Sequence, residues 1–369
     1  MIIENNINMK LRVVFLLPSL GGGGSERVFM NLCKYFNKDK FEVTLCLLKK
    51  EGEFLPQIEE DPTISIHDLK VSRVRYSIYP IIKFIRKEQP DIVLSTLGHL
   101  NAMLSAVSFL IPRNVKVIGR ESNIVSKSNH NRISILFYKM FYKNFDKIIV
   151  QSDDMEIDLK NLVRNLKENQ VVKINNPVDL KHIQSLKHST SILLPQDKIN
   201  LISVGSLTYQ KGYDLLFKSF AKFEDKEKYH ISIIGKGKLK NELIELLKIL
   251  NIEKHVSLLG FQDNPYKYIS QSSIFISSSR FEGFPNVVLE SLICDVPVIA
   301  NNYKGGINEI INKPIFGQII DIENSELLER TCNKILSKDH SKDKISEEVN
   351  QRYGITSIVS RYEDLILNM

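Results

Sequence analysis

The sequence alternates short apolar segments with longer helical patterns, and it does so in two successive series. The first segment, Leu11–Leu17, is apolar at every position but one, as expected for a strand buried on both faces of a parallel sheet. Four consecutive glycines, Gly21–Gly24, follow it, and a helical pattern begins at Ser25. Alternation of this kind is typical of right-handed β-α-β units. The sequence therefore predicts an α/β protein with two doubly wound, Rossmann-like domains.

The remaining strand predictions divide between the two series. Those of the first series are Phe41–Leu48, Ile92–Ser95, Val115–Gly119, Lys147–Gln151 and Val171–Ile174. Those of the second series are Leu201–Val204, His230–Ile234, His255–Leu258, Ile274–Ser277 and Pro297–Ala300. Between them, His182–Lys198 is polar and aperiodic and is interpreted as a linker. We expect a first domain over residues 1–180, a second over 181–350, and a C-terminal segment, 351–369, whose helix packs back on the first domain.

Composition excludes several classes of protein. With 369 residues, 43% hydrophobic and 25% charged, the chain has an ordinary globular composition. No apolar run approaches the roughly 20 residues needed to span a bilayer, and the polar residues 1–8 do not resemble a secretory signal. The four cysteines show no C-x-x-C spacing, which favours core thiols in a reducing cytoplasm.

The positive charge lies in the first half of the chain. Residues 1–180 hold 26 lysines and arginines against 20 acidic residues, whereas the rest is nearly balanced. A basic half indicates an anionic partner such as phosphate groups or a phospholipid surface, although lysines can also serve only to solubilise a surface. Nucleic acid is not expected, because no zinc-finger, helix-turn-helix or RNA-binding motif is present.

Glycine turns follow the first strand of each series. After Leu11–Leu17, Gly21–Gly24 lets backbone N–H groups approach a ligand, and the helix end offers positive charge to a phosphate; a plain flexible turn fits equally well. After Leu201–Val204, the turn contains Gly205 and leads to Lys211 at the start of a helix. A lysine there can pair with a diphosphate, or lie on the surface near a helix cap.

A third segment carries two glutamates eight positions apart. Glu282 lies in the loop after strand Ile274–Ser277, and Glu290 lies inside the helix that Pro285 introduces. They do not stack on one helical face, so we expect them to contact opposite ends of one elongated ligand whose phosphates rest on the helix end. Burying both would be costly without hydroxyl or similar partners.

With these residues in place, the sequence resembles the retaining glycosyltransferases of family 4. The likeness covers nearly the whole chain, and its motifs are Gly23–Val28, Gly260–Pro265, Phe281–Asn286 with Glu290, and Pro297–Ala300. It implies the GT-B fold with two Rossmann-like domains facing across a cleft, a nucleotide-diphosphate sugar as co-substrate, no other cofactor and no required metal. No Asp-x-Asp triplet occurs in the sequence.

The resemblance also implies residue roles. Glu282 matches the glutamate that contacts the transferred sugar, Glu290 the one that holds the ribose, and Lys211 the lysine that neutralises the departing diphosphate. The family's usual arginine after the strand-end glycine is Ser206 here, and Arg280, Lys236 or Arg120 are candidates to replace it. The expected donor-binding residues are Gly23, Gly24, Gly205, Ser206, Lys211, Glu282, Gly283, Phe284, Pro285, Asn286 and Glu290, with Glu282 and Lys211 catalytic.

The acceptor is expected to bind the first domain. His99, Arg120 and Glu121 follow predicted strands there, and we expect Arg120 to bind an acceptor phosphate while Glu121 or His99 orients its hydroxyl. Lys127–Lys147 mixes basic and aromatic residues, as helices in the lipid headgroup layer do, although its apolar positions can equally be core. Together with the charge of the first half, this favours a membrane-associated acceptor, such as a polyprenyl-diphosphate-linked glycan, and a location on the inner face of the cytoplasmic membrane.

The predicted function is therefore transfer of a hexose or N-acetylhexosamine, with UDP as the preferred nucleotide, in surface-polysaccharide synthesis such as that of lipopolysaccharide or capsule. Two alternatives stay open: a non-catalytic glycosyltransferase-like partner subunit, and a soluble transferase with a non-lipid acceptor. A nicotinamide-dependent dehydrogenase is disfavoured, because Leu48-Lys49-Lys50 offers basic residues where an acidic one is needed.

Overall fold

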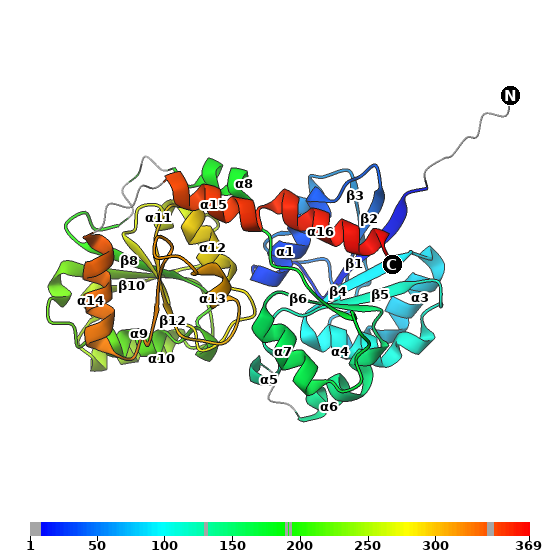
Figure 1. Ribbon diagram of the computed structural model, residues 1–369, viewed down its shortest axis with the longest axis horizontal. Coiled ribbons are helices and arrows are strands. Elements are labelled where there is room, and N and C mark those ends of the chain that lie inside the picture. The colour runs from blue at the N-terminus through cyan, green and yellow to red at the C-terminus, as the bar shows by residue number, and fades with distance from the viewer. Residues whose placement is uncertain (1–8, 129–131, 189–190, 192–193, 338–342) are drawn as a thin grey trace. The chain divides into compact units, whose positions relative to one another are not determined.

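The computed structural model describes all residues except 1–8, 129–131, 189–190, 192–193 and 338–342 (Figure 1). The chain forms two compact units, residues 1–177 with 355–369 and residues 178–354. The chain enters the second unit at Val178 and leaves it after Gly354, and these two points are neighbours, since the Val178 N–H donates to the Tyr353 carbonyl at 2.8 Å. The C-terminal residues from 355 onward thus belong to the first unit, and the segment 351–354 belongs to the second.

The first unit is built on a seven-stranded parallel sheet with the order β3-β2-β1-β4-β5-β6-β7. Its strands are β1 (Leu11–Leu17), β2 (Phe41–Leu47), β3 (Ile64–Asp68), β4 (Ile92–Thr96), β5 (Lys116–Arg120), β6 (Lys147–Val150) and β7 (Val171–Lys173). The chain reverses its crossover direction between β1 and β4, as in doubly wound sheets.

Helices cover both faces of this sheet (Figure 1). On one face lie α1 (Gly24–Tyr35), α2 (Leu55–Glu59) and α16 (Ile355–Leu367). On the other lie α3 (Ile78–Glu88), α4 (Gly98–Val107), α5 (Val125–Ser128), α6 (Arg132–Phe141) and α7 (Asp153–Leu162). In α16, Ile358 and Tyr362 are fully buried against the residues of β1 and α1, which fixes this last helix to the first unit.

The second unit repeats the plan with a six-stranded parallel sheet of order β10-β9-β8-β11-β12-β13. Its strands are β8 (Ile199–Val204), β9 (Tyr229–Ile234), β10 (Val256–Gly260), β11 (Ile274–Ser277), β12 (Val298–Asn301) and β13 (Gly317–Ile320). One face is covered by α9 (Tyr213–Phe220), α10 (Lys240–Ile249) and α14 (Ser325–Leu336). The other is covered by α8 (Leu180–Leu186), α11 (Tyr266–Ile269), α12 (Asn286–Ile293), α13 (Ile307–Ile310) and α15 (Asp343–Tyr353). The two parallel-sheet α/β units predicted from the alternation are confirmed.

The strands β3 and β13 and the helix α8 are among the elements that were not predicted from the sequence. β3 and β13 are edge strands in which four of five and two of four residues, respectively, are not fully buried, so neither forms the continuous apolar run of a central strand. The predicted linker is wrong at its start, because residues 182–186 belong to α8. The Asp179 side chain caps this helix by accepting a hydrogen bond from the His182 N–H, and Ile183 anchors it in the core.

Arg120, at the end of β5, lies in the interior of the first unit. Its guanidinium is part of a side chain only 1% exposed, and it donates to the Asn176 Oδ1 at 2.5 Å, to the Thr96 Oγ1 at 3.2 Å and to the Tyr362 Oη at 3.2 Å. These bonds tie β4, β5 and α16 together. The expectation that Arg120 binds an acceptor phosphate is therefore not supported, because its donors already face groups of its own unit.

Glu121 is also enclosed, with 3% of its surface exposed. Its carboxylate accepts hydrogen bonds from the Asn101 Nδ2 at 3.0 Å, from the Tyr138 Oη at 3.2 Å and from the Tyr142 Oη. Burial raises the pKa of this carboxyl, and the three hydrogen bonds only partly offset that effect. In this setting Glu121 links β5 to α4 and α6, and the expectation that it orients an acceptor hydroxyl is not supported.

The raised pKa of Glu121 gives a pH-dependent contribution to stability. The folded chain keeps this proton at pH values where the unfolded chain has lost it, so the contribution declines as pH rises from about 4 through the raised pKa. Glu121→Gln removes the ionisation and keeps an acceptor for the neighbouring donors. Thermal unfolding experiments compare the melting temperatures of the variant and the wild type. We expect the difference, variant minus wild type, to become more positive as the pH is raised from about 4.5 to about 8. A difference independent of pH would contradict a buried, titrating Glu121.

Candidate active site

Lys211 and Glu282 meet at the point where the second sheet reverses its crossover direction. Lys211 follows β8, and Glu282 follows β11, the neighbouring strand on the other side of the reversal. The Lys211 Nζ lies 2.6 Å from the Glu282 Oε1, and the two side chains are only 17% and 11% exposed. Ligands of open α/β sheets bind at this position, outside the carboxyl ends of the strands. Two residues that lie 71 positions apart in sequence thus form one ion pair there.

Two further side chains hold the Glu282 carboxylate in place. The Ser279 Oγ donates to the same Oε1 at 2.7 Å, and the Gln210 Nε2 donates to Oε2 at 3.0 Å and to the Phe281 carbonyl at 3.0 Å. Both carboxylate oxygens therefore have donors, which explains how an acidic side chain that is largely buried is tolerated. Ser279 and Gln210 were not predicted as site residues; the only signal in the sequence is that each lies close to a residue that was.

Glycines allow the backbone segments of the site to approach one another closely. Gly212 has φ +63°, and a Cβ there would lie 2.2 Å from the Ser278 carbonyl oxygen. Gly305, at φ +133°, lies against the loop of Glu282, whose carbonyl oxygen would be 2.1 Å from an added Cβ. Side chains at either position would push apart the loops that carry the ion pair.

Gly205 provides space for the side chain of Lys211. A Cβ at Gly205 would lie 2.7 Å from the Lys211 Cε, so the lysine stem passes directly over this glycine. The Gly205 carbonyl accepts a hydrogen bond from the Tyr213 Oη at 3.2 Å, which fixes the turn. The sequence predicted that Gly205 lies in a ligand-binding turn. In the structure, the absence of a side chain at Gly205 makes room for the side chain of Lys211.

The remaining predicted donor residues of this unit lie in the loop before α12 and in the helix. The Gly283 carbonyl accepts from the Gly306 N–H at 2.9 Å, and the Phe284 ring packs where a Cβ on Gly306 would be. Pro285 occupies the N-cap position, one residue earlier than the first helical position, and no side-chain hydrogen bond caps the helix. Asn286 starts α12, and Glu290, 5% exposed, lies one turn farther along.

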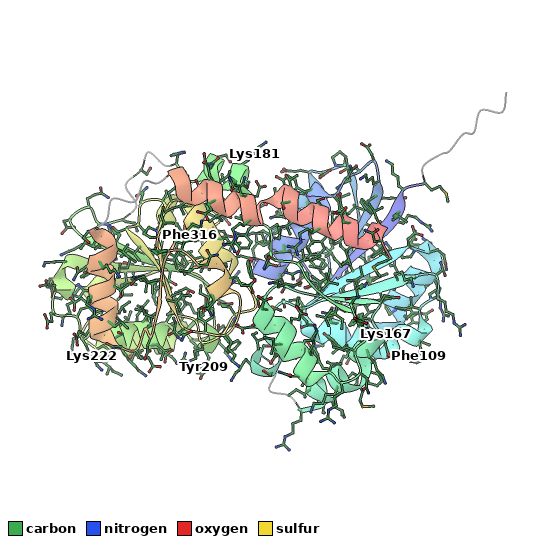
Figure 2. The ribbon with its side chains drawn as sticks, viewed as in Figure 1. Phe109, Lys167, Lys181, Tyr209, Lys222 and Phe316 are labelled. Atoms are coloured by element: carbon green, nitrogen blue, oxygen red, sulfur yellow. The ribbon has the colours of Figure 1, made fainter. Side chains whose placement is uncertain are left out.

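Arg280 is not available to replace the arginine that the family has at Ser206. Its guanidinium forms two bonds to the Asp214 carboxylate, at 2.8 and 2.7 Å, and lies 4.1 Å from the centre of the Tyr209 ring. Hydrogen bonding and charge from Arg280 lower the pKa of Asp214. Tyr209, which is exposed, can be followed in Figure 2. The Arg280–Asp214 ion pair stabilises the turn that carries Lys211. This ion pair was not predicted from the sequence.

Lys236 is the candidate cation that lies beside Ser206. Both residues follow paired parallel strands, β8 and β9, and the Leu207 N–H donates to the Lys236 carbonyl at 3.0 Å. Lys236 is exposed, and its Nζ is 5.0 Å from the centre of the Phe261 ring. The turns after β8 and β9 can lie this close together because residue 235 is glycine. A Cβ there would lie 1.9 Å from the Gly205 carbonyl oxygen.

In the first unit, the side chain of Glu26, from the first turn of α1, lies against the predicted glycine loop Gly21–Gly24. Gly23 is the N-cap residue of α1 and Gly24 its first residue, and a Cβ on Gly23 would lie 2.4 Å from the Glu26 Oε2. Burial raises the pKa of Glu26. A phosphate at this helix end would meet the Glu26 side chain, whose raised pKa favours its neutral form.

His99 is placed as the sequence indicated, in the first turn of α4 after β4. Its side chain is exposed, and partial desolvation lowers its pKa below the usual value, which favours the neutral imidazole. The preceding residue, Leu97, has φ +73°, an uncommon conformation for a residue with a Cβ. Of the three predicted acceptor residues, His99 is the one whose side chain is accessible.

The described residues contain neither a cluster of metal-binding side chains nor a helix that could span a membrane. No group of three or more histidine, cysteine, aspartate or glutamate side chains is arranged there to hold a metal ion. No helix in the same part of the chain is long and apolar enough to cross a membrane.

Comparison with known proteins identifies the family. Residues 22–182 match the model for "Glycosyltransferase Family 4", and residues 184–352 match the model for "Glycosyl transferases group 1". The chain is 31% identical, over 87% of its length and 89% of the relative's, to the N-acetylgalactosamine-N,N'-diacetylbacillosaminyl-diphospho-undecaprenol 4-alpha-N-acetylgalactosaminyltransferase of Campylobacter jejuni. It is 23% identical to an amylovoran biosynthesis glycosyltransferase of Erwinia amylovora, over 93% and 96% of the two chains.

Solved structures share the fold over nearly the whole chain. The Anabaena protein HepE in complex with UDP-glucose superposes with a TM-score of 0.77 at 17% identity, covering 97% of this chain and all of that one. A sucrose-phosphate synthase of Thermosynechococcus elongatus gives a TM-score of 0.80 at 16% identity, over 97% and 99%. The chain therefore belongs to the family 4 glycosyltransferases, which have the GT-B fold.

Proposed function

We propose that this glycosyltransferase transfers a hexose or N-acetylhexosamine from a UDP-sugar, with retention of configuration and without a metal ion. The acceptor is a membrane-associated, polyprenyl-diphosphate-linked glycan in surface-polysaccharide synthesis. The observation that carries the proposal is the Lys211–Glu282 pair at the reversal of the second sheet, held by Ser279 and Gln210.

The chemistry assigned to these residues is electrostatic. As the bond between the sugar and the nucleoside diphosphate breaks, positive charge develops on the sugar ring and negative charge on the diphosphate. The Lys211 ammonium and the N-terminal end of α12 stabilise the departing diphosphate, while Glu282 faces the sugar. The acceptor hydroxyl attacks from the same face, and a departing phosphate oxygen takes its proton, which accounts for retention without a protein nucleophile.

Relatives support the nature of donor and acceptor. The Campylobacter jejuni relative is named for a diphospho-undecaprenol acceptor and an N-acetylgalactosamine donor group, and the Erwinia amylovora relative for amylovoran biosynthesis. HepE, which shares the fold, was solved with UDP-glucose. We therefore place the same classes of substrate on this chain.

The donor is tested by thermal shift against UDP, GDP and ADP and their sugars. A nucleotide at about 100 times its Kd adds about 2.7 kcal/mol of stability to the folded chain. We expect UDP to give the largest shift, and turnover of a UDP-sugar by the purified chain to separate an enzyme from a non-catalytic partner subunit. No shift with any of the nucleotides, together with no turnover, would contradict the proposed function.

Glu282→Gln tests the role of the carboxylate. The amide oxygen can still accept from Lys211 and Ser279, but the Lys211 ammonium loses its counter-charge and the negative charge facing the sugar is lost. We expect kcat to fall at least about a hundredfold while the Kd for UDP, measured by calorimetry, changes little. Glu242→Gln, an exposed carboxylate of α10, is the matched control and should keep wild-type kcat. A variant at position 282 with near-normal turnover would exclude the assigned role.

Lys236→Met tests whether this lysine supplies the second positive charge that Ser206 does not. Because Lys236 lies beside Ser206 at the ends of β8 and β9, its loss should weaken UDP binding by about tenfold, equivalent to roughly 1.4 kcal/mol. The control is Lys238→Met, two residues farther along and also exposed, which should bind UDP as the wild type does. Equal Kd values for UDP in all three proteins would show that Lys236 does not contact the diphosphate.

A further inference from the structure

We propose that α6 and an adjoining basic hollow of the first unit form the surface that docks on an anionic phospholipid bilayer. The inference rests on the proposed membrane-associated acceptor and identifies the side chains that bring the enzyme to the membrane. It is carried by the exposure of α6, by the cations around it and by a hollow next to its C-terminal end.

α6 is an apolar helix that the fold leaves largely uncovered. Within it, Tyr138 is the one described residue that is buried, and the helix packs on α4. Ile133, Leu136 and Met140 are 66%, 51% and 49% exposed. Their spacing of three and four residues places them along one face of the helix, which we call the α6 stripe. Large apolar side chains grouped in this way on a surface mark a site of association.

The basic hollow lies where α6 ends. It encloses about 640 Å³ and is lined, among other residues, by Phe109, Arg113, Lys143, Asp146 and Lys167. Lys143 belongs to the short helical turn Tyr142–Asn144 that continues α6. Phe109, 78% exposed, and Lys167 lie at the same edge of the first unit (Figure 2). The α6 stripe and the hollow are thus neighbours in the fold.

The charges favour a phospholipid headgroup in the hollow. In the described part of the chain, Arg113, Lys143 and Lys167 are exposed and form no ion pair. The acidic residue of the lining, Asp146, is already engaged, since its oxygens accept from the Lys116 Nζ at 3.2 Å and from the Val117 N–H at 2.8 Å. Arg132 and Lys139 add two further exposed cations on α6 itself. An apolar stripe bordered by cations matches the acyl boundary and the anionic headgroups of a bilayer.

Part of the segment that first indicated a membrane surface lies outside the described residues, namely His130. The aromatic residues of that segment do not form one exposed surface. Tyr138, Tyr142 and Phe145 are buried in the core, whereas the aliphatic residues of the α6 stripe are the exposed ones. The exposed apolar side chains of α6 are therefore aliphatic, and the exposed aromatic of the docking surface is Phe109, in the hollow.

The test is sedimentation of the full chain with vesicles of phosphatidylcholine containing about one third phosphatidylglycerol. We expect the wild type to bind these vesicles and to bind neutral phosphatidylcholine vesicles much more weakly. Leu136→Ser with Met140→Ser should lower the affinity for the anionic vesicles at least about tenfold. Lys143→Glu with Lys167→Glu should do the same and should also weaken the dependence on salt.

Matched controls separate docking from folding and from catalysis. Ile157→Ser removes an isoleucine that is 58% exposed on α7 among acidic residues, and Lys222→Glu with Lys334→Glu makes the same charge change in the second unit. All variants should bind UDP as the wild type does, so a failure of the donor site remains distinguishable from a failure of docking. Absence of vesicle binding by the wild type, or unchanged binding by both α6-region variants, would overturn the proposal. So would a dimer that Leu136→Ser with Met140→Ser converts to a monomer, because the stripe would then be an interface between two copies.

Discussion

The ion pair between Lys211 and Glu282 is the interaction on which the organisation of the second unit depends. It joins the ends of β8 and β11, the two strands between which the sheet reverses direction, and it lies almost entirely out of water. A pair in such a place is costly to form and more costly to break, since either charge alone would be buried without compensation. Ser279 and Gln210 complete the hydrogen bonding of the carboxylate, so the arrangement is fixed before any ligand arrives. The family's chemistry needs a fixed arrangement, because preorganised charges stabilise a leaving group without having to reorient.

Three glycines of the second unit allow the Lys211–Glu282 ion pair to form. Gly205 makes room for the stem of Lys211, and Gly212 and Gly305 let neighbouring loops approach within distances that a Cβ would forbid. The Arg280–Asp214 pair then braces the turn from the outer side. Because Arg280 is committed to this bracing, it does not supply the second positive charge proposed beside Lys211, whereas Lys236 is an exposed cation that the paired ends of β8 and β9 bring to Ser206.

The first unit uses its polar residues differently. Arg120 and Glu121, at the carboxyl end of β5, are buried in the interior. Arg120 connects α16 to the sheet by its hydrogen bond to Tyr362, and Glu121 connects α6 to β5 by the hydrogen bond that it accepts from Tyr138. Glu26 covers the glycine loop at the start of α1. Of the first-unit residues that the sequence marked for contact with other molecules, His99 near the end of β4 and the apolar and basic residues around α6 are exposed. The packing that fixes α6 from within also leaves its outer face exposed.

The sequence by itself determined the two parallel-sheet units, most of their central strands, and the segments that carry Lys211, Glu282 and Glu290. It could do so because buried parallel strands are continuous apolar runs and because glycine turns mark where such strands end. Only the tertiary structure decided which side chains meet. Arg120 and Arg280 look alike as free cations beside predicted strands, yet the burial of one behind Tyr362 and the pairing of the other with Asp214 depend on residues 242 and 66 positions away. Contacts at that separation are set by how the strands are ordered in a sheet, which local patterns of hydrophobicity and turn residues do not encode.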